Sequence, residues 1–132
     1  MGEIAGGGFH SLALRSDGTV FAWGRNVEGQ TTVPAGLGDA VAVSGGAFHS
    51  LALKSNGTVV AWGRNDQGQG SVPVNLDGVA AIAAGGYHNL ALKTNGTIVA
   101  WGFNANGQTT VPPGATGMVA VAGGGYHSIA LR

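Results

Sequence analysis

The sequence repeats itself every 39 residues, and this repeat limits the fold more than any other feature. Tryptophan recurs within an Ala-Trp-Gly triplet, at Trp23, Trp62 and Trp101. Histidine and proline recur at the same interval, at His10, His49, His88 and His127 and at Pro34, Pro73 and Pro112. A fixed period of this length is the signature of a repeat architecture. The pattern predicts three full units at 1–39, 40–78 and 79–117, followed by 118–132, the start of a fourth.

Each unit is predicted to form four short strands and no helix. In the second unit, apolar or β-branched runs fall near 40–43, 48–54 and 58–62, and the run 69–72, which ends in Val72, is expected as a short fourth strand. Asn56-Gly57 separates two of these runs, and such a dipeptide favours a two-residue type I′ hairpin turn. Pro73 follows the last run and suits an outer edge strand, since proline has no donor for a central one.

A repeated four-stranded unit of this length is typical of a β-propeller blade. The fold class expected is therefore all-β, with three full blades, and with 118–132 supplying the first two strands of a fourth. Blades pack face to face, so the inner strands should be apolar on both sides. We expect the tryptophans to fill the gaps between neighbouring blades.

Composition excludes several classes of function. Lys and Arg number 6, as do Asp and Glu, so the net charge is zero and the sequence favours neither a nucleic-acid nor a membrane partner. The chain has no cysteine, which excludes disulfides and thiolate chemistry. Glycine is abundant, at 26 residues, but 44% of the chain is hydrophobic, and this favours a folded core over disorder.

The sequence offers no catalytic, cofactor-binding or metal-binding set. Histidine is the only ionisable residue type that recurs unchanged in every unit, and copies in separate blades would stand too far apart to share a metal. Ser11, Ser50 and Ser128 each follow a histidine directly, so serine and histidine should point to opposite faces of a strand. We therefore interpret the recurring histidines and tryptophans as structural and expect no enzyme activity.

The unit at 85–112 resembles the regulator-of-chromosome-condensation repeat. The resemblance rests on the segments G-G-Y-H-N-L-A-L, I-V-A-W-G-F-N and G-Q-T-T-V-P. The short repeat is most similar to the bacterial branch, which includes propeller-type β-lactamase inhibitor proteins. The resemblance implies a ring that is usually seven-bladed, and it alone points to a bacterial, secreted protein. The residues themselves leave the compartment open.

One end of the blades is the candidate protein-binding face. The loops there carry aromatic and charged residues, some of which differ from unit to unit on a constant frame, and interface hot spots favour tyrosine, tryptophan and arginine. The candidate residues are Phe9, Arg25, Glu28, Phe48, Arg64, Asp66, Tyr87, Phe103 and Tyr126. The alternative interpretation is that these aromatic residues only cover the end of the core.

The sequence predicts a non-enzymatic interaction scaffold that self-assembles. Three blades do not close a ring, so two chains, with six full blades, are expected to pair as a homodimer. The alternative is an excised or engineered propeller fragment with no function beyond folding and self-assembly. Guanine nucleotide exchange and β-lactamase inhibition follow only from family analogy.

Overall fold

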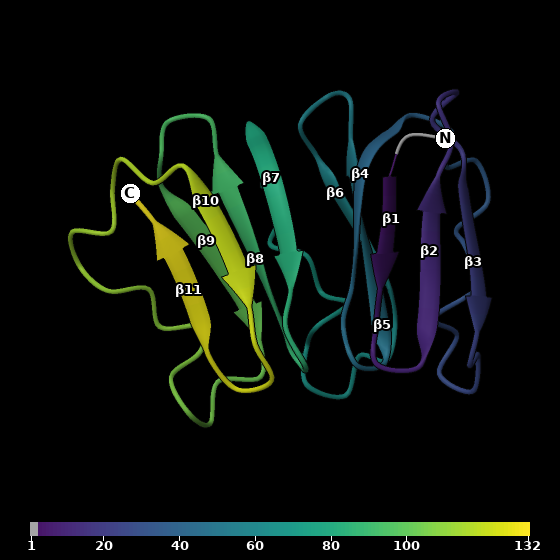
Figure 1. Ribbon diagram of the computed structural model, residues 1–132. Helices are drawn as coiled ribbons and strands as arrows, with labels where there is room; N and C mark the ends of the chain where they lie inside the picture. The colour runs from purple at the N-terminus through teal and green to yellow at the C-terminus, as the bar shows by residue number, and fades with distance from the viewer. Residues whose placement is uncertain (1–2) are drawn as a thin grey trace.

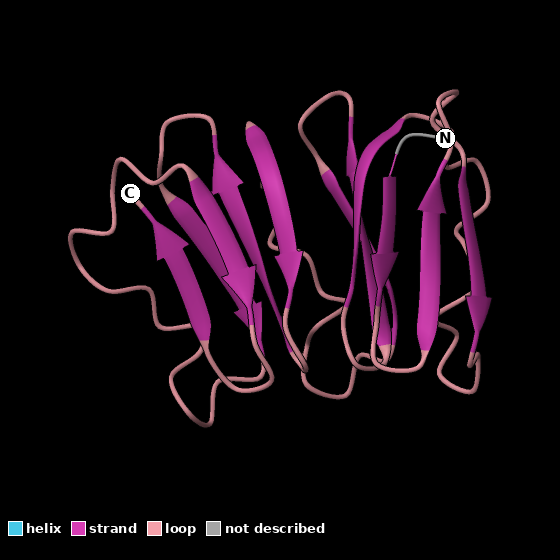
Figure 2. Ribbon diagram, viewed as in Figure 1, coloured by secondary structure: helices cyan, strands magenta, loops and turns pink. Residues whose placement is uncertain are grey.

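In the computed structural model, residues 3–132 are described, and all their regular elements are β-strands (Figures 1 and 2). Met1, where the first unit was expected to begin, lies outside the described residues. The strands are β1 (Glu3–Gly6), β2 (His10–Leu14), β3 (Val20–Gly24), β4 (Ala40–Gly45), β5 (His49–Lys54), β6 (Val59–Gly63), β7 (Val79–Ala84), β8 (His88–Lys93), β9 (Ile98–Gly102), β10 (Ala120–Gly123) and β11 (Ser128–Leu131). Among these residues no helix is long and apolar enough to span a membrane.

The strands form four antiparallel sheets that stand in a row (Figure 1). Three sheets have three strands each, in the orders β1-β2-β3, β4-β5-β6 and β7-β8-β9, and β10 pairs with β11 in the last. The first strands of successive sheets contact one another, from β1 to β4 to β7 to β10. The prediction of an all-β chain of repeated antiparallel sheets is confirmed.

The expected strand at 69–72 is not formed. Residues 69 and 70 are part of a turn, and residues 71–73 have no regular structure. The segment instead contributes side chains, since Val72 packs partly buried against the core cluster that contains Trp101. The sequence signal was the short segment Gln-Gly-Ser-Val before Pro73, which is equally compatible with an extended segment packed on the outside of a sheet.

The hairpin turns contain a glycine with positive φ, but they are not type I′. Gly57 has φ 83°, whereas Asn75 is the one non-glycine residue among 3–132 with positive φ, so Asn56 lacks the conformation that type I′ requires. The amide of Gly57 donates to the carbonyl of Lys54 at 3.0 Å, and Lys54 N donates to the carbonyl of Thr58 at 2.8 Å. This pattern is a type I turn closed by a glycine bulge.

Between the sheets lie two equivalent hydrophobic clusters. Trp62 from the second sheet packs with Leu12 and Val20 of the first, and Trp101 from the third packs with Leu51 and Val59 of the second. Both tryptophans are buried, as predicted. Trp23 is not: it is 53% exposed, because among residues 3–132 no other sheet packs over it as the first sheet packs over Trp62.

Candidate protein-binding face

The loops at the lower edge of the sheets in Figure 1 carry four aromatic residues. Each stands in the loop between the first and second strand of its sheet, and we call Phe9, Phe48, Tyr87 and Tyr126 the aromatic row. Ring centroids are 5.5 Å apart for Phe9–Phe48, 6.1 Å for Phe48–Tyr87 and 6.2 Å for Tyr87–Tyr126. These distances lie in the range in which aromatic rings attract one another. The 39-residue repeat therefore produces a continuous strip of rings, whose end members Phe9 and Tyr126 are largely exposed.

Two arginines lie over this row. The guanidinium of Arg25 stands 5.9 Å from the Phe9 centroid and 5.4 Å from that of Phe48. In the second unit, the guanidinium of Arg64 stands 5.5 Å from the Phe48 centroid and 6.0 Å from that of Tyr87. Each arginine thus bridges two rings of neighbouring sheets in cation–π geometry.

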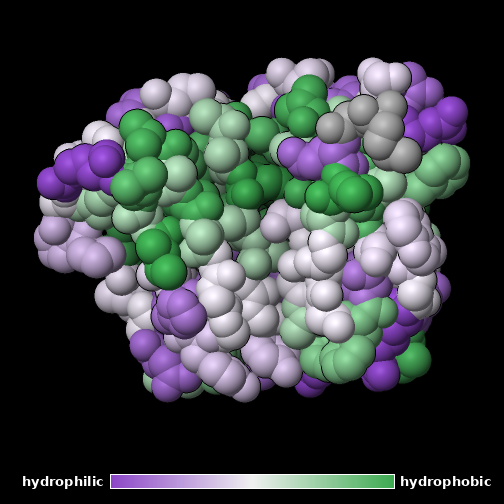
Figure 3. Space-filling model, in the orientation of Figure 1, coloured by the Kyte–Doolittle hydropathy of each residue, from purple (hydrophilic) through white to green (hydrophobic). Residues whose placement is uncertain are grey.

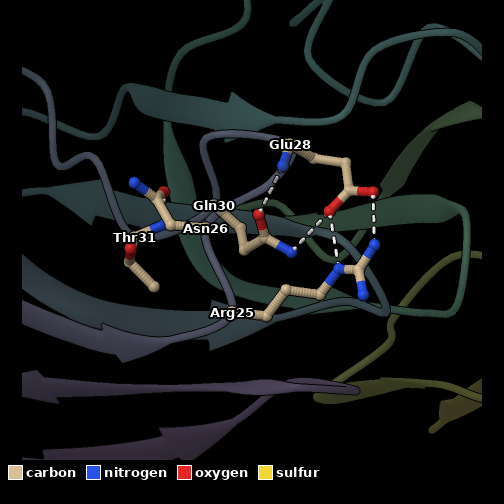
Figure 4. A network of polar contacts seen from close by, with 5 residues as sticks. All are labelled: Arg25, Asn26, Glu28, Gln30 and Thr31. Atoms are coloured by element: carbon tan, nitrogen blue, oxygen red, sulfur yellow. Dashed lines mark hydrogen bonds and ion pairs between the residues drawn. The ribbon is translucent and has the colours of Figure 1, made fainter.

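Acidic partners hold both arginines in place. Arg25 Nε and Nη2 donate to the two carboxylate oxygens of Glu28 at 2.9 and 3.1 Å, and Gln30 Nε2 donates to one of them at 3.1 Å (Figure 4). The Arg25 guanidinium, aided by Gln30, lowers the pKa of Glu28 to about 2. Arg64 pairs with Asp66 in the next unit and lowers the pKa of that carboxyl group. The charges on the face are therefore paired.

The loops that carry these residues are tied down by their own side chains. Asn26 Oδ1 accepts from the amide of Thr31 at 3.0 Å, and Gln30 Oε1 accepts from the amide of Glu28 at 3.0 Å (Figure 4). The same two bonds recur in the later units, through Asn65 and Gln69 and through Asn104 and Gln108. A surface built on such loops is ordered before any partner arrives, and this lowers the entropic cost of binding.

The third unit departs from the pattern because Phe103 replaces the arginine. Its ring meets Tyr87 edge to face, with centroids 6.2 Å apart. Phe103, Tyr87 and Tyr126 line a shallow hollow together with Arg64 and Gln67. All nine candidate residues are linked through these ring, cation–π and ion-pair contacts, so the structure brings them together on one surface.

A second set of polar residues lies inside the molecule, between the sheets. His10 Nε2 lies 2.8 Å from Ser50 Oγ, and Ser50 Oγ donates to the carbonyl of Gln30 at 2.9 Å. Since the serine proton is used in that bond, His10 Nε2–H is the donor to Ser50. Trp62 Nε1 donates to the same Gln30 carbonyl at 2.9 Å. We call this arrangement of histidine, serine or asparagine, glutamine carbonyl and tryptophan the inter-sheet relay.

The relay repeats between the second and third sheets. There His49 Nε2 lies 2.7 Å from Asn89 Oδ1, and Asn89 Nδ2 and Trp101 Nε1 both donate to the carbonyl of Gln69. Histidine and the residue after it do point to opposite faces of their strand, as expected, so each reaches a different neighbouring sheet. Sequence reasoning missed the glutamines, although they too recur at 39-residue intervals as Gln30, Gln69 and Gln108.

Burial changes the chemistry of the relay histidines. Desolvation lowers the pKa of His49 to about 4, and it also lowers the pKa of His10 and His88. Each imidazole packs against a glycine, and a Cβ on Gly46 would collide with the His49 ring. Within residues 3–132 no group of three or more His, Asp or Glu side chains is arranged to hold a metal ion. The arrangement fits hydrogen-bonding residues of a core.

Comparison with known proteins agrees with this geometry. The sequence model of the regulator of chromosome condensation (RCC1) repeat matches residues 3–30, 40–69 and 79–108. The matched segments cover more than half of the chain, and each includes the three strands of one sheet. The fold and the recurring residues thus define a β-propeller repeat protein. The chain belongs to the RCC1 repeat family.

Solved structures support the same fold. The ectodomain of the receptor kinase CR4 from Physcomitrella patens has 27% identity and a TM-score of 0.78, over 98% of this chain and 37% of that one. Human WBSCR16 has 21% identity and a TM-score of 0.79, over 96% of this chain and 44% of that one. Prp20p from Saccharomyces cerevisiae has 20% identity and a TM-score of 0.65, over 98% of this chain and 54% of that one. The chain therefore spans about half or less of these proteins. No curated protein sequence matches it.

Proposed function

We propose that this chain is a non-enzymatic protein-binding propeller segment and that the aromatic row with its bridging arginines is the binding face. The observation that carries the proposal is the continuous contact from Phe9 to Tyr126, with a guanidinium over each of the first two gaps. Tyrosine and arginine are enriched among interface hot spots because they combine apolar area with directed hydrogen bonds.

The charge pairing on this face indicates the kind of partner. Arg25 and Arg64 are each matched by a carboxylate, so the surface offers no net charge to steer an acidic or basic ligand. A protein surface that presents aromatic and aliphatic side chains fits it best. Among the structural neighbours, yeast RCC1 (Prp20) is described in complex with Kap60, and Prp20p in terms of its binding to Gsp1p and histones. Those partners belong to those proteins and support only the general use of the fold for protein interaction.

A displayed peptide library selected against the purified chain tests this proposal. Peptides selected on the wild-type protein should lose at least about tenfold in affinity against Tyr87→Ala and Arg64→Ala, as measured by calorimetry. Val74→Ser is the matched control, because Val74 is 88% exposed and lies outside the face. Selected peptides that bind both face variants as tightly as the wild type would overturn the proposal. A chain that yields no binders would favour a structural segment that only folds and assembles.

We propose further that the chain self-associates, with a homodimer of six full blades as the expected closed form. The two ends of the row of sheets support this. Phe21 and Trp23 on the first sheet, and Ile129 and Leu131 on the last, are each more than half exposed. Figure 3 shows hydrophobic atoms gathered where β10 and β11 lie. Light scattering tests it: a mass of one chain, 13.0 kDa, throughout the micromolar range would refute self-association.

A further inference from the structure

A cleft lies beside β11. It has a volume of about 520 Å³ and opens between the last two sheets and the segment 106–115 that precedes β10. β11 forms one wall, and its four residues are all exposed. Within the part of the chain that the structure describes, its outer edge is unpaired, since β10 and β11 make a two-stranded sheet. An unpaired edge beside an apolar cleft is a place where a further strand can add.

The cleft repeats the surroundings of the two buried tryptophans. Trp62 belongs to a cluster that includes Leu12, Val20, Val33 and Leu37. Trp101 belongs to the equivalent cluster, with Leu51, Val59, Val72 and Leu76. The residues one repeat further on all line the cleft, and they are Leu90, Ile98, Val111 and Ala115. This third site holds no indole, because the chain has tryptophan only at 23, 62 and 101. Ala115 stands where the earlier units have Leu37 and Leu76, and its smaller side chain leaves more room in the cleft.

A hydrogen-bond acceptor for an indole is already in place. In the first two sites a glutamine carbonyl accepts both from tryptophan Nε1 and from the serine or asparagine of the next sheet. In the third, the carbonyl of Gln108 accepts from Ser128 Oγ at 2.7 Å. A carbonyl oxygen has two lone pairs, so Gln108 can accept a second hydrogen bond. The cleft therefore has the shape, the apolar lining and the acceptor of a tryptophan socket.

We propose that this socket binds Trp23 of a second copy of the chain, an inference that rests on the proposed self-association. Trp23 is 53% exposed on β3, and among residues 3–132 of its own chain no glutamine carbonyl accepts from it as Gln30 accepts from Trp62. The contact is heterologous: the tryptophan at the start of one chain enters the socket at the end of another. Repeating the contact in the opposite direction closes a two-chain ring.

The strand register makes this delivery feasible. In β2 and β3, Ser11 pairs with Trp23, and in the second sheet Ser50 pairs with Trp62 in the same way. The β10–β11 hairpin has the register of β1–β2, with Gly123 opposite Ser128 as Gly6 is opposite Ser11. Segments 3–14 and 120–131 are identical at eight of twelve positions. Either hairpin can thus pair with β3, and pairing with β10–β11 places Trp23 opposite Ser128, the serine that bonds the Gln108 carbonyl.

The self-association of three full-length variants, measured separately by analytical ultracentrifugation, tests the proposal. Trp23→Ala should weaken self-association by at least about 30-fold, the loss typical of a buried aromatic hot spot. Val111→Asp should weaken it as much, because it places a carboxylate in the socket. Val27→Ala, in the exposed loop after β3, is the control and should associate like the wild type. Circular dichroism confirms that each variant is folded.

Mixing the two disabled variants gives the decisive result. The Trp23→Ala chain keeps an intact socket and the Val111→Asp chain keeps an intact tryptophan, so an equimolar mixture should form a two-chain species that neither forms alone. A mixture that stays monomeric, or a Trp23→Ala chain that associates like the wild type, overturns the socket and leaves self-association standing. A wild-type chain that is monomeric refutes both.

Discussion

His49 Nε2 lies 2.7 Å from Asn89 Oδ1, although the two residues belong to different sheets and are 40 positions apart. Both are completely buried. His49 Nδ1 is buried and has no hydrogen-bond partner among residues 3–132, so protonation of the ring would add a charge and an unpaired donor to the core. The bond ties neighbouring sheets together and makes the stability of the core depend on the neutral form of the histidine.

Acid should therefore destabilise the protein before its carboxylates titrate. The pKa of His49 is about 4 in the folded chain, against 6.5 as the ordinary value. When the pH falls below 6.5 the unfolded chain takes up a proton that the folded chain excludes, so stability is lost from about pH 6.5 down to about pH 4. For His49 the loss is about 3 kcal/mol, and His10 and His88 act in the same direction.

Urea denaturation at a series of pH values measures this effect. His49→Gln keeps a side-chain amide that can donate to Asn89, and its stability should change less between these pH values than that of the wild type. Glu28 contributes only in a lower window, from its ordinary pKa of 4.5 down to about 2, so it does not confuse the result. A free energy of unfolding that stays constant from pH 6.5 to 4 would contradict the assignment.

The contribution of Asn89 to stability can be tested by replacing it with alanine and with serine, the residue that the other units have at this position. Asn89→Ala leaves the His49 donor and one bond of the Gln69 carbonyl unmatched, and it should cost about 1–3 kcal/mol. Asn89→Ser is the matched control, because Ser50 and Ser128 stand at the equivalent positions and make both bonds. Asn89→Ser should lower the free energy of unfolding clearly less than Asn89→Ala does. Equal losses for the two variants, measured by urea denaturation, would mean that the hydrogen bonds contribute nothing.

Trp62 and Trp23 lie in different environments, so replacing each by alanine should lower the free energy of unfolding by different amounts. Trp62 is 8% exposed and hydrogen-bonded to the Gln30 carbonyl, so Trp62→Ala should lose about 3–5 kcal/mol. Trp23→Ala should lose much less in the monomer, because its ring is half exposed. Thermal unfolding of dilute samples compares the two. Similar losses would show that Trp23 is buried in solution.

Periodicity alone predicted most of the fold, because a repeat at 39 residues and strand-length apolar runs have few structural solutions. The errors have local causes. Trp23 and Trp62 both lie in an Ala-Trp-Gly-Arg-Asn segment, and a neighbouring sheet packed against the indole buries only Trp62. The inter-sheet relay was missed because its partners, such as His49 and Asn89, are far apart along the chain. The face residues could be proposed from loop position, but the arginine bridges over the aromatic row needed three-dimensional distances.

The hairpin glycines give the last prediction. Gly57 has φ 83°, a conformation that β-branched residues rarely adopt, and a Cβ at this position would lie 3.2 Å from the amide nitrogen of Gly78. Gly57→Val should therefore destabilise the chain by about 1–2 kcal/mol or more. Gly57→Asn should cost less, since asparagine tolerates positive φ, although it meets the same neighbour. Melting temperatures measured by circular dichroism distinguish the two. A valine variant as stable as the asparagine variant would show that the bulge adopts another backbone conformation in solution.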